Sequence, residues 1–398
     1  MGRLGILVLS VLVIVLVPVA APGGQAPMFL APALRAGNAP ASAVSGGAEP
    51  MILIAPDGAS VLIGDSSGLH VSMDHGATWA HRDVPELPGA FTDGRPLALD
   101  AAGTLYAADT QGEVIAVSAS HDLGKTWTNT NYVVGAAAIA DRPWLAAGAA
   151  GQVVLVYYAT GLGERCVYSN DGGATWITQT LNNGGPSNAG NVILDAQGRV
   201  WYAEGGVYLV RWNAPCQGNV QYAYVGGGGA QIFTQVAVNA AGDSFVARPP
   251  NGNAQMQLVG MHGMDASTRK TVTVSPPSLH SNSFGSIASR ADGSEVAVAW
   301  FGSTSAGDPS GAFTGSWDVY VARVTGYWTA APTITVTKVT TTSNHFGGFC
   351  MGGVSCTSGR ALLDYMGVTY DPAGNVHVAY GQDTSGSVTV EYAVLPHL

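Results

Sequence analysis

Charged residues are scarce in this chain. Asp, Glu, Lys and Arg make up 11% of its 398 residues, and only three of them are lysines. Amphipathic helices carry charged residues along their exposed face, so this scarcity argues against a largely helical protein. The sequence instead alternates Val, Ala, Tyr and Thr and contains 54 glycines, a pattern typical of short strands joined by tight turns. We expect an all-β fold.

Clusters of basic residues are also missing. The formal net charge is −10, and no stretch of the sequence concentrates Lys or Arg. Nucleic acids bind to basic surfaces, so nucleic acid is not an expected partner. A negatively charged sugar stays open as a ligand, because a local arginine pocket could still form.

Cysteine is limited to four residues, and an even number in an exported chain favours disulfides. Three pairings are open. One of them joins the neighbours Cys350 and Cys356 and leaves Cys166 to pair with Cys216. Zinc sites need Cys or His more closely grouped than this, and the nearest approach to such grouping is His345 beside Cys350, which a surface loop explains equally well.

No metal or cofactor is expected. Asp308 and Asp318 lack the alternating oxygen ligands of a calcium loop, so structural calcium there has no support. The run Gly226–Gly229 has no following Lys and no strand-to-helix context. We interpret it as a connection between units rather than as a phosphate cradle.

Long apolar runs are confined to the N-terminus. Arg3 precedes an apolar stretch that ends in small residues, which is typical of a secretory signal peptide. An uncleaved anchor is the alternative, but the stretch barely reaches the ~20 residues that span a bilayer. We expect residues 1–21 to be removed, 22–47 to form a linker and closing strand, and 48–398 to form one domain. The mature protein is then secreted or extracytoplasmic, with no stable membrane span.

One eight-residue phrase, Ser-x-Asp-x-Gly-x-Thr-Trp, occurs three times. The copies span Ser72–Trp79, Ser120–Trp127 and Ser169–Trp176, so they begin 48 and then 49 residues apart. A fixed period of this length is typical of stacked or radial repeats. Each copy lies between two strand-like runs and is expected to form the turn of a hairpin. We refer to the three copies as the repeat turns.

The residues of the repeat turns have predictable structural roles. The aspartates should accept backbone hydrogen bonds and hold the turns closed, and they are Asp74, Asp122 and Asp171. The glycines suit a positive φ, and they are Gly76, Gly124 and Gly173. The tryptophans supply apolar area at the start of the outgoing strands, and they are Trp79, Trp127 and Trp176. Catalysis or calcium binding is the alternative, but three equivalent sites on separate units cannot meet at one active centre.

The repeat turns resemble the Asp-box, or bacterial neuraminidase repeat, of sialidases and related β-propellers. The resemblance implies a propeller whose repeat turns lie at the end opposite the binding loops. It does not imply one function, because many propellers that are not sialidases carry the motif. Sialidases also have an Arg-Ile-Pro phrase near the mature N-terminus. This sequence has none, and Arg95-Pro96 and Arg142-Pro143 are poor substitutes.

A weaker repeat gives the number of units. An apolar strand, a glycine turn and a second apolar strand recur seven times, with turn glycines Gly58, Gly103, Gly151, Gly198, Gly242, Gly293 and Gly374. This predicts a propeller of four-stranded antiparallel blades, seven favoured and six next. The last unit ends after its third strand, so a strand from Met28–Pro50 should close the ring. The sialidases of this family have six blades, so seven blades depart from their pattern.

Three polar loops precede innermost strands and should converge at one end of the ring. They are Thr92–Pro96, Ala140–Trp144 and Arg360–Tyr365, and the long segments Gly302–Ser316 and Thr341–Gly359 should rise over the same face. Arginines there could grip a sugar carboxylate, with Arg95, Arg142 and Arg360 as candidates. Trp317, placed in an exposed loop, is the candidate for stacking on a sugar ring, and His345 for a further contact.

Catalysis would need an acid at this face. Asp93, Asp141 and Asp364 are the candidates, if burial or a nearby negative charge raises the pKa of the carboxyl. The resemblance to sialidases implies a tyrosine nucleophile, for which Tyr365 is the candidate. The alternative is that Asp93–Arg95 and Asp141–Arg142 are structural ion pairs.

Three functions therefore stay open. The first is a binding propeller for extracellular glycan or glycoprotein. The second is a sialidase-like exo-glycoside hydrolase, and the third is an extracytoplasmic scaffold or assembly factor. A buried acid beside an arginine cluster would favour the enzyme over the binding protein.

Overall fold

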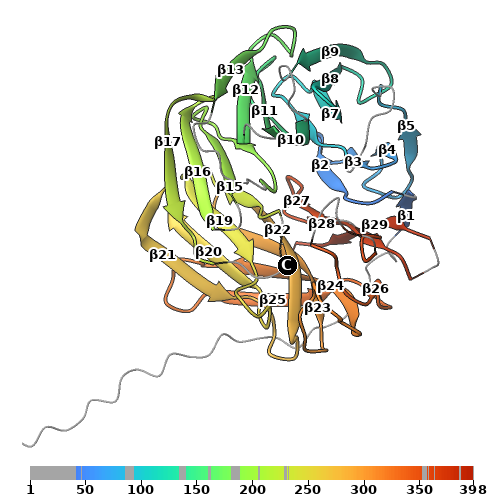
Figure 1. Ribbon diagram of the computed structural model, residues 1–398, viewed down its shortest axis with the longest axis vertical. Helices are drawn as coiled ribbons and strands as arrows, with labels where there is room; N and C mark the ends of the chain where they lie inside the picture. The colour runs from blue at the N-terminus through green and yellow to red at the C-terminus, as the bar shows by residue number, and fades with distance from the viewer. Residues whose placement is uncertain are drawn as a thin grey trace, which may run out of the picture.

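The computed structural model describes residues 42–45, 47–85, 94–133, 140–159, 163–180, 189–204, 207–227, 231, 233–351, 356, 358–362, 364–384 and 387–397. The expected signal peptide lies outside these residues, and so does Asp93. The described chain forms seven antiparallel sheets arranged as a ring, which confirms the seven-bladed all-β propeller (Figure 1).

The first four blades follow one another along the chain. Blade 1 consists of β2 (Met51–Ile54), β3 (Val61–Asp65), β4 (Gly68–Ser72) and β5 (Ala80–Arg82). Blade 2 consists of β6 (Leu97–Leu99), β7 (Leu105–Gln111), β8 (Val114–Ser120) and β9 (Thr128–Val133). Blade 3 consists of β10 (Ala140–Ala147), β11 (Val153–Ala159), β12 (Gly163–Ser169) and β13 (Ile177–Thr180). Blade 4 consists of β14 (Ile193–Leu194), β15 (Val200–Glu204), β16 (Tyr208–Ala214) and β17 (Gln217–Tyr224).

The remaining three blades complete the ring. Blade 5 consists of β18 (Val236–Val238), β19 (Asp243–Arg248), β20 (Gln257–His262) and β21 (Asp265–Thr273). Blade 6 consists of β22 (Ser281–Ser289), β23 (Glu295–Ser303), β24 (Ser316–Thr325) and β25 (Thr333–Lys338), with the short β26 (His345–Phe346) paired to β24. Blade 7 consists of β27 (Gly367–Tyr370), β28 (Val376–Gln382), β29 (Thr389–Leu395) and β1 (Ser42–Ser45).

The ring is closed by the N-terminal strand. β1 pairs antiparallel with β29, with Ser42 opposite Tyr392 and Ala43 opposite Glu391 (Figure 1). The outermost strand of blade 7 thus comes from the opposite end of the chain. This confirms the predicted closing strand, which covers the edge that β29 would otherwise expose.

The core consists of seven apolar clusters, one between each pair of neighbouring blades in the described part of the chain. Each sheet is covered on both faces, so the second strand of a blade is apolar at nearly every position. β23, for example, is buried along its whole length. Burial at about 25 cal/mol per Å² of apolar surface makes these contacts the main stabilising term of the fold.

The turns and the incoming loops of the blades lie at opposite ends of the ring. All seven turn glycines between the first and second strands have a positive φ, from 71° to 87°. Because the strands alternate in direction, these turns and the repeat turns lie at one end, which we call the turn face. The loops that precede the innermost strands lie at the other end, which we call the incoming face.

Candidate functional site

The repeat turns are held by the same hydrogen bonds in all three copies. Asp74 Oδ1 accepts from the Thr78 backbone N–H (2.8 Å) and from Ser72 Oγ (2.7 Å), while Oδ2 accepts from Thr78 Oγ1 (2.7 Å). The bonds recur around Asp122 and Asp171. These bonds favour the charged carboxylate, so hydrogen bonding from Thr78 and Ser72 lowers the pKa of Asp74 to about 2. The carboxylates of these turns therefore stabilise their own loops.

Each repeat turn also packs against the preceding blade. A Cβ on Gly76 would collide with the Tyr392 ring of blade 7, and one on Gly124 would collide with Leu69 of blade 1. Trp79 makes an edge contact with Tyr392 at 5.1 Å between ring centroids. The repeat turns thus join blades at the turn face, far from the loops of the incoming face.

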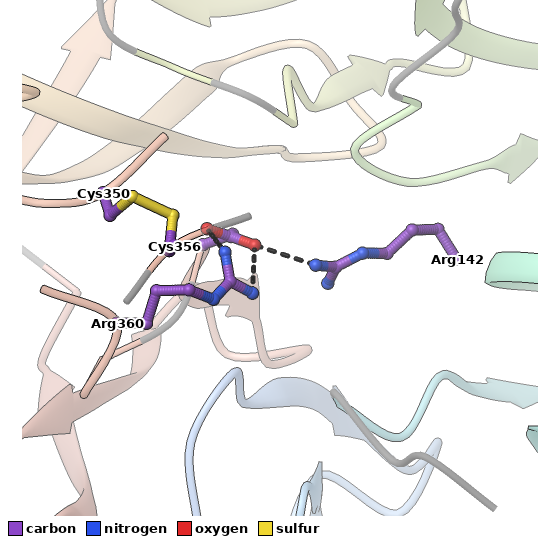
Figure 2. The surroundings of a disulfide bond; sticks show 5 residues. Arg142, Cys350, Cys356 and Arg360 are labelled. Atoms are coloured by element: carbon purple, nitrogen blue, oxygen red, sulfur yellow. Dashed lines mark hydrogen bonds and ion pairs between the residues drawn. A yellow bond between two sulfur atoms is a disulfide. The ribbon is translucent and has the colours of Figure 1, made fainter. Parts of the chain in front are cut away.

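A network of charges lies at the incoming face, near the centre of the ring. Arg142 Nη1 bonds both carboxylate oxygens of Glu49 (2.9 and 3.1 Å), and its Nη2 bonds Asp364 Oδ2 (2.8 Å). Arg360 bonds the same Asp364 through both terminal nitrogens (3.1 Å each). Figure 2 shows Arg142 and Arg360 reaching toward that carboxylate from two sides, with the Cys350–Cys356 disulfide nearby. We call Glu49, Arg142, Arg360 and Asp364 the central network.

The central network is buried and balanced in charge. The side chains of Glu49 and Asp364 are 0% exposed, and Arg142 is 13% exposed. Asp364 also donates its backbone N–H to the Glu49 carboxylate (3.1 Å), so a hydrogen bond links the two acids in addition to the ion pairs that each makes with Arg142. Two carboxylates and two guanidiniums leave no net charge, which is the condition under which buried ions are tolerated.

Aromatic rings form the wall beside the central network. Phe233 lies under the Arg142 guanidinium at 4.4 Å, and Trp144 lies 5.2 Å from Tyr365 between ring centroids. Gly94 is required here, because a Cβ would collide with the Tyr365 hydroxyl. The cavity between these loops measures only about 20 Å³, roughly the space of one water molecule. A sugar does not fit in it.

The structure brings several of the predicted site residues together and separates others. Arg142, Arg360 and Asp364 meet directly, and Tyr365 lines the small cavity beside Arg142. Asp141 is 53% exposed and lies 3.8 Å from the Arg142 guanidinium. Arg95 is fully buried, so it is not positioned to grip a ligand.

The expectation that Trp317 is exposed was wrong. Its side chain is 0% exposed and packs on Phe313 and Phe349, and its indole N–H donates to Gly347 O (2.7 Å). The cause is β26, whose His345 pairs with Trp317 and brings the following segment over the indole. Trp317 therefore presents no free ring to a sugar.

His345 lies at a larger cleft on the incoming face. Its Nδ1 lies 2.9 Å from Asp383 Oδ2, and its ring stacks on Phe349 at 4.9 Å. The cleft has a volume of about 550 Å³. We call it the side cleft, and its lining includes Ser310, His345, Phe346, Phe349, Cys350, Cys356, Ser358, Ala361 and Asp383. Phe346 is 64% exposed, so one large apolar ring is presented to solvent at this cleft.

Glu49 is the site residue that sequence reasoning missed. It has a positive φ of 54°, as Arg142 does at 51°, and both precede a proline at the start of an innermost strand. Arg95 also precedes a proline at the start of blade 2. A charged residue followed by Pro at the start of three successive blades is the signal that could have identified Glu49.

The four cysteines form two disulfides, as expected. Cys166–Cys216 joins β12 of blade 3 to the turn between β16 and β17 of blade 4. Cys350–Cys356 closes a local loop at the side cleft. The first bond fixes two blades together, and the second shapes a loop of the incoming face.

The described residues offer no grouped set of metal ligands. Nowhere in these ranges do three His, Cys, Asp or Glu side chains group so that they could hold a metal ion. Asp308 accepts hydrogen bonds from Ser310, and Asp318 pairs with Lys338 at 2.9 Å. The same ranges contain no helix with the length and apolarity that crossing a bilayer requires.

No family model and no curated protein matches this sequence. Solved structures do share its fold. YCF48 bound to D1 peptide is 14% identical over 89% of this chain and 95% of that chain, with a TM-score of 0.54. YCF48 from Cyanidioschyzon merolae is 11% identical over 90% and 99%, with a TM-score of 0.52. The GH74 xyloglucanase from Xanthomonas campestris is 14% identical over 88% of this chain and 55% of that chain, with a TM-score of 0.50. At such identities the likeness is one of fold.

Proposed function

We propose that this protein is a non-catalytic binding propeller of the Asp-box type that works outside the cytoplasm. The observation that carries the proposal is the closed central network. Within the described residues, Asp364 meets the criterion set for an enzyme, a buried acid beside arginines, but its carboxylate is already bonded to both Arg142 and Arg360. A general acid must reach the substrate oxygen, and a fully buried, doubly paired carboxylate does not. The recurring geometry of the repeat turns supports the Asp-box resemblance.

The side cleft is the proposed ligand site. Its volume of about 550 Å³ falls within the ~300–1,000 Å³ of small-ligand pockets, whereas the central cavity is far smaller. Phe346 offers apolar surface, and Ser310, Ser358 and His345 line the cleft with polar groups. That mixture suits a neutral or weakly polar sugar, whose ring has an apolar face and a hydroxyl rim. The two disulfides support export, because such bonds persist in oxidising compartments.

The test of this proposal combines turnover and binding. We expect no release of product from fluorogenic glycosides, including a sialoside, or from xyloglucan. Turnover that disappears in Asp141→Asn would overturn the non-catalytic assignment, since Asp141 is the exposed one of the two candidate acids that the structure describes. On a glycan array we expect binding that Phe346→Ala weakens about tenfold, the loss of one stacked ring. Met73→Ala is the matched control, because Met73 is 56% exposed but lies in a repeat turn at the opposite end.

Peptide binding is the second candidate. It is favoured by the fold shared with YCF48, whose solved structure holds D1 peptide. A peptide array probed with the same two variants separates the candidates. Peptide binding that depends on Phe346, with no glycan binding, would mean that the side cleft binds a peptide rather than a sugar.

A further inference from the structure

Three exposed tyrosines gather on the two outer strands of blade 4, on the sheet face that Val210 and Trp212 also occupy. Tyr208, Tyr222 and Tyr224 are 45%, 40% and 47% exposed, and they are half of the six large hydrophobic side chains exposed in the described ranges. Tyr208 lies opposite Tyr224 across β16 and β17, with 5.8 Å between ring centroids, and 6.5 Å from Tyr222. Exposed aromatic rings in one patch are unusual on a soluble protein and mark an interaction site.

Two arginines of blade 5 lie beside these tyrosines. Arg269 of β21 reaches across to blade 4, where its Nη1 donates to Tyr224 O (3.3 Å) and its Cζ lies 5.7 Å from the Tyr224 ring centroid. The two strands β17 and β21 run as neighbours on the outer rim (Figure 1). Arg248 ends β19, and its guanidinium packs on Gly226, where a Cβ would collide with it.

The charge of Arg248 is not balanced by any acid that the structure describes. The residue is only 7% exposed, its Nη1 donates to Gly227 O, and its Nε has no hydrogen-bond partner within the described ranges. Burial lowers the pKa of Arg248, Tyr224 raises it, and the nearby charge of Arg269 lowers it further. A buried cation normally has a carboxylate partner, as Arg142 and Arg323 have in this protein.

We propose that this patch binds an acidic saccharide. The exposed Arg269 supplies the contact for a sugar carboxylate, the buried Arg248 adds positive charge behind it, and Tyr208, Tyr222 and Tyr224 supply rings on which the sugar stacks. We call these five residues the flank site. The chain carries a net charge of −10, but no described acid is paired with Arg248 or Arg269, so the Tyr224 end of this site attracts an anion, whereas Glu204 lies opposite Tyr208 at the other end. The flank site is separate from the side cleft and does not depend on the function proposed for it.

Titration calorimetry of the full protein with a short oligogalacturonate tests this proposal. The fully methyl-esterified oligomer is the matched probe, since it keeps the sugar rings but has no carboxylate. We expect the acid form to bind at least about tenfold more tightly than the ester, as charge-assisted hydrogen bonds predict, and to weaken as salt is raised. Arg269→Gln and Tyr224→Ala should each weaken binding of the acid about tenfold. Arg248→Gln should weaken binding less than Arg269→Gln does, because the buried Arg248 acts on the ligand only through its charge.

Control variants test whether the acid form binds at the flank site. Arg199→Gln removes an arginine that is already paired with Asp195 and stacked on Trp201, and it should leave the affinity unchanged. Phe346→Ala in the side cleft should also leave it unchanged. Arg248→Gln alters a buried side chain and can prevent folding. In that case the test depends on Arg269→Gln, which alters an exposed side chain. Equal binding of acid and ester, no binding of the acid, or binding only of an acidic peptide would each overturn the proposal.

Discussion

At the scale of single residues, two kinds of glycine turn can be distinguished. Gly76 and Gly103 have nearly the same φ, 87° and 82°, but a Cβ on Gly76 would meet the Tyr392 ring whereas one on Gly103 would meet nothing within 4 Å. The first glycine is needed for both conformation and contact, and the second for conformation alone.

This difference predicts unequal costs of adding a methyl group. Gly103→Ala should lower the free energy of unfolding by about 1 kcal/mol, the cost of a left-handed alanine. Gly76→Ala should lower it by roughly 2–4 kcal/mol, because a forced contact with Tyr392 adds to that strain. Urea unfolding of the two variants beside the parent protein measures both values. Equal decreases in the free energy of unfolding would mean that the repeat turn can shift to accept the methyl group without disturbing Tyr392 of blade 7.

The repeat-turn aspartates predict an acid-sensitive contribution to stability. Their pKa values in the folded state are about 2, below the ~3.9 of an unfolded chain. Their stabilisation is therefore complete above about pH 4 and is lost as the pH falls toward 2. The triple variant D74N/D122N/D171N should be less stable than the parent at pH 7, with the difference shrinking across that range.

Unfolding midpoints in urea at a series of pH values measure this dependence. Asp83→Asn is the control, because the Asp83 side chain is 99% exposed and lies outside the repeat turns. A difference between the triple variant and the parent that stays constant down to about pH 2 would contradict the assignment of the acid sensitivity to these carboxylates.

At the scale of strands and loops, the two disulfides should contribute unequally. Cys166–Cys216 closes a separation of 50 residues and Cys350–Cys356 one of 6. The chain-entropy relation then gives about 4 kcal/mol for the first and about 2 kcal/mol for the second. The variants C166A/C216A and C350A/C356A should show this order in their unfolding temperatures. A larger loss on opening the local loop would show that the side cleft depends on Cys350–Cys356 more than chain entropy predicts.

The elements themselves could be predicted from the sequence, because they depend on local patterns. Turn glycines such as Gly58 and Gly374 and the three repeat turns fix hairpins within a few residues, and seven hairpins give the number of blades. The site was less predictable, because its contacts join distant loops. Glu49 meets Arg142 and Asp364 only when blades 1, 3 and 7 surround one centre. Trp317 is covered by β26, a pairing that no periodicity indicates.

At the scale of the whole molecule, the central network ties together blades that are not sequential neighbours. Arg142 of blade 3 holds Glu49 at the start of blade 1 and Asp364 at the start of blade 7. Arg360 contacts only Asp364 within this network. The two arginines therefore differ in how much of the ring they connect.

This difference predicts which arginine the ring needs more. Arg142→Met should lower the free energy of unfolding by roughly 3–5 kcal/mol, because it leaves two buried carboxylates without their shared partner. Arg360→Met should cost less, since Asp364 retains Arg142. Thermal unfolding compares them, and the double variant E49Q/R142M should recover part of the loss. If Arg142→Met proved no more harmful than Arg360→Met, the network would not be a link across the ring.

The pairing of β1 with β29 also sets an order of events. Residues 42–45 are made early, yet their partner strand ends at Leu395. Until that final hairpin emerges, the first strand has no partner and is an unpaired edge that can pair wrongly. A ring built this way resists opening from either end once complete, but until then it is exposed to aggregation for nearly the whole length of its synthesis.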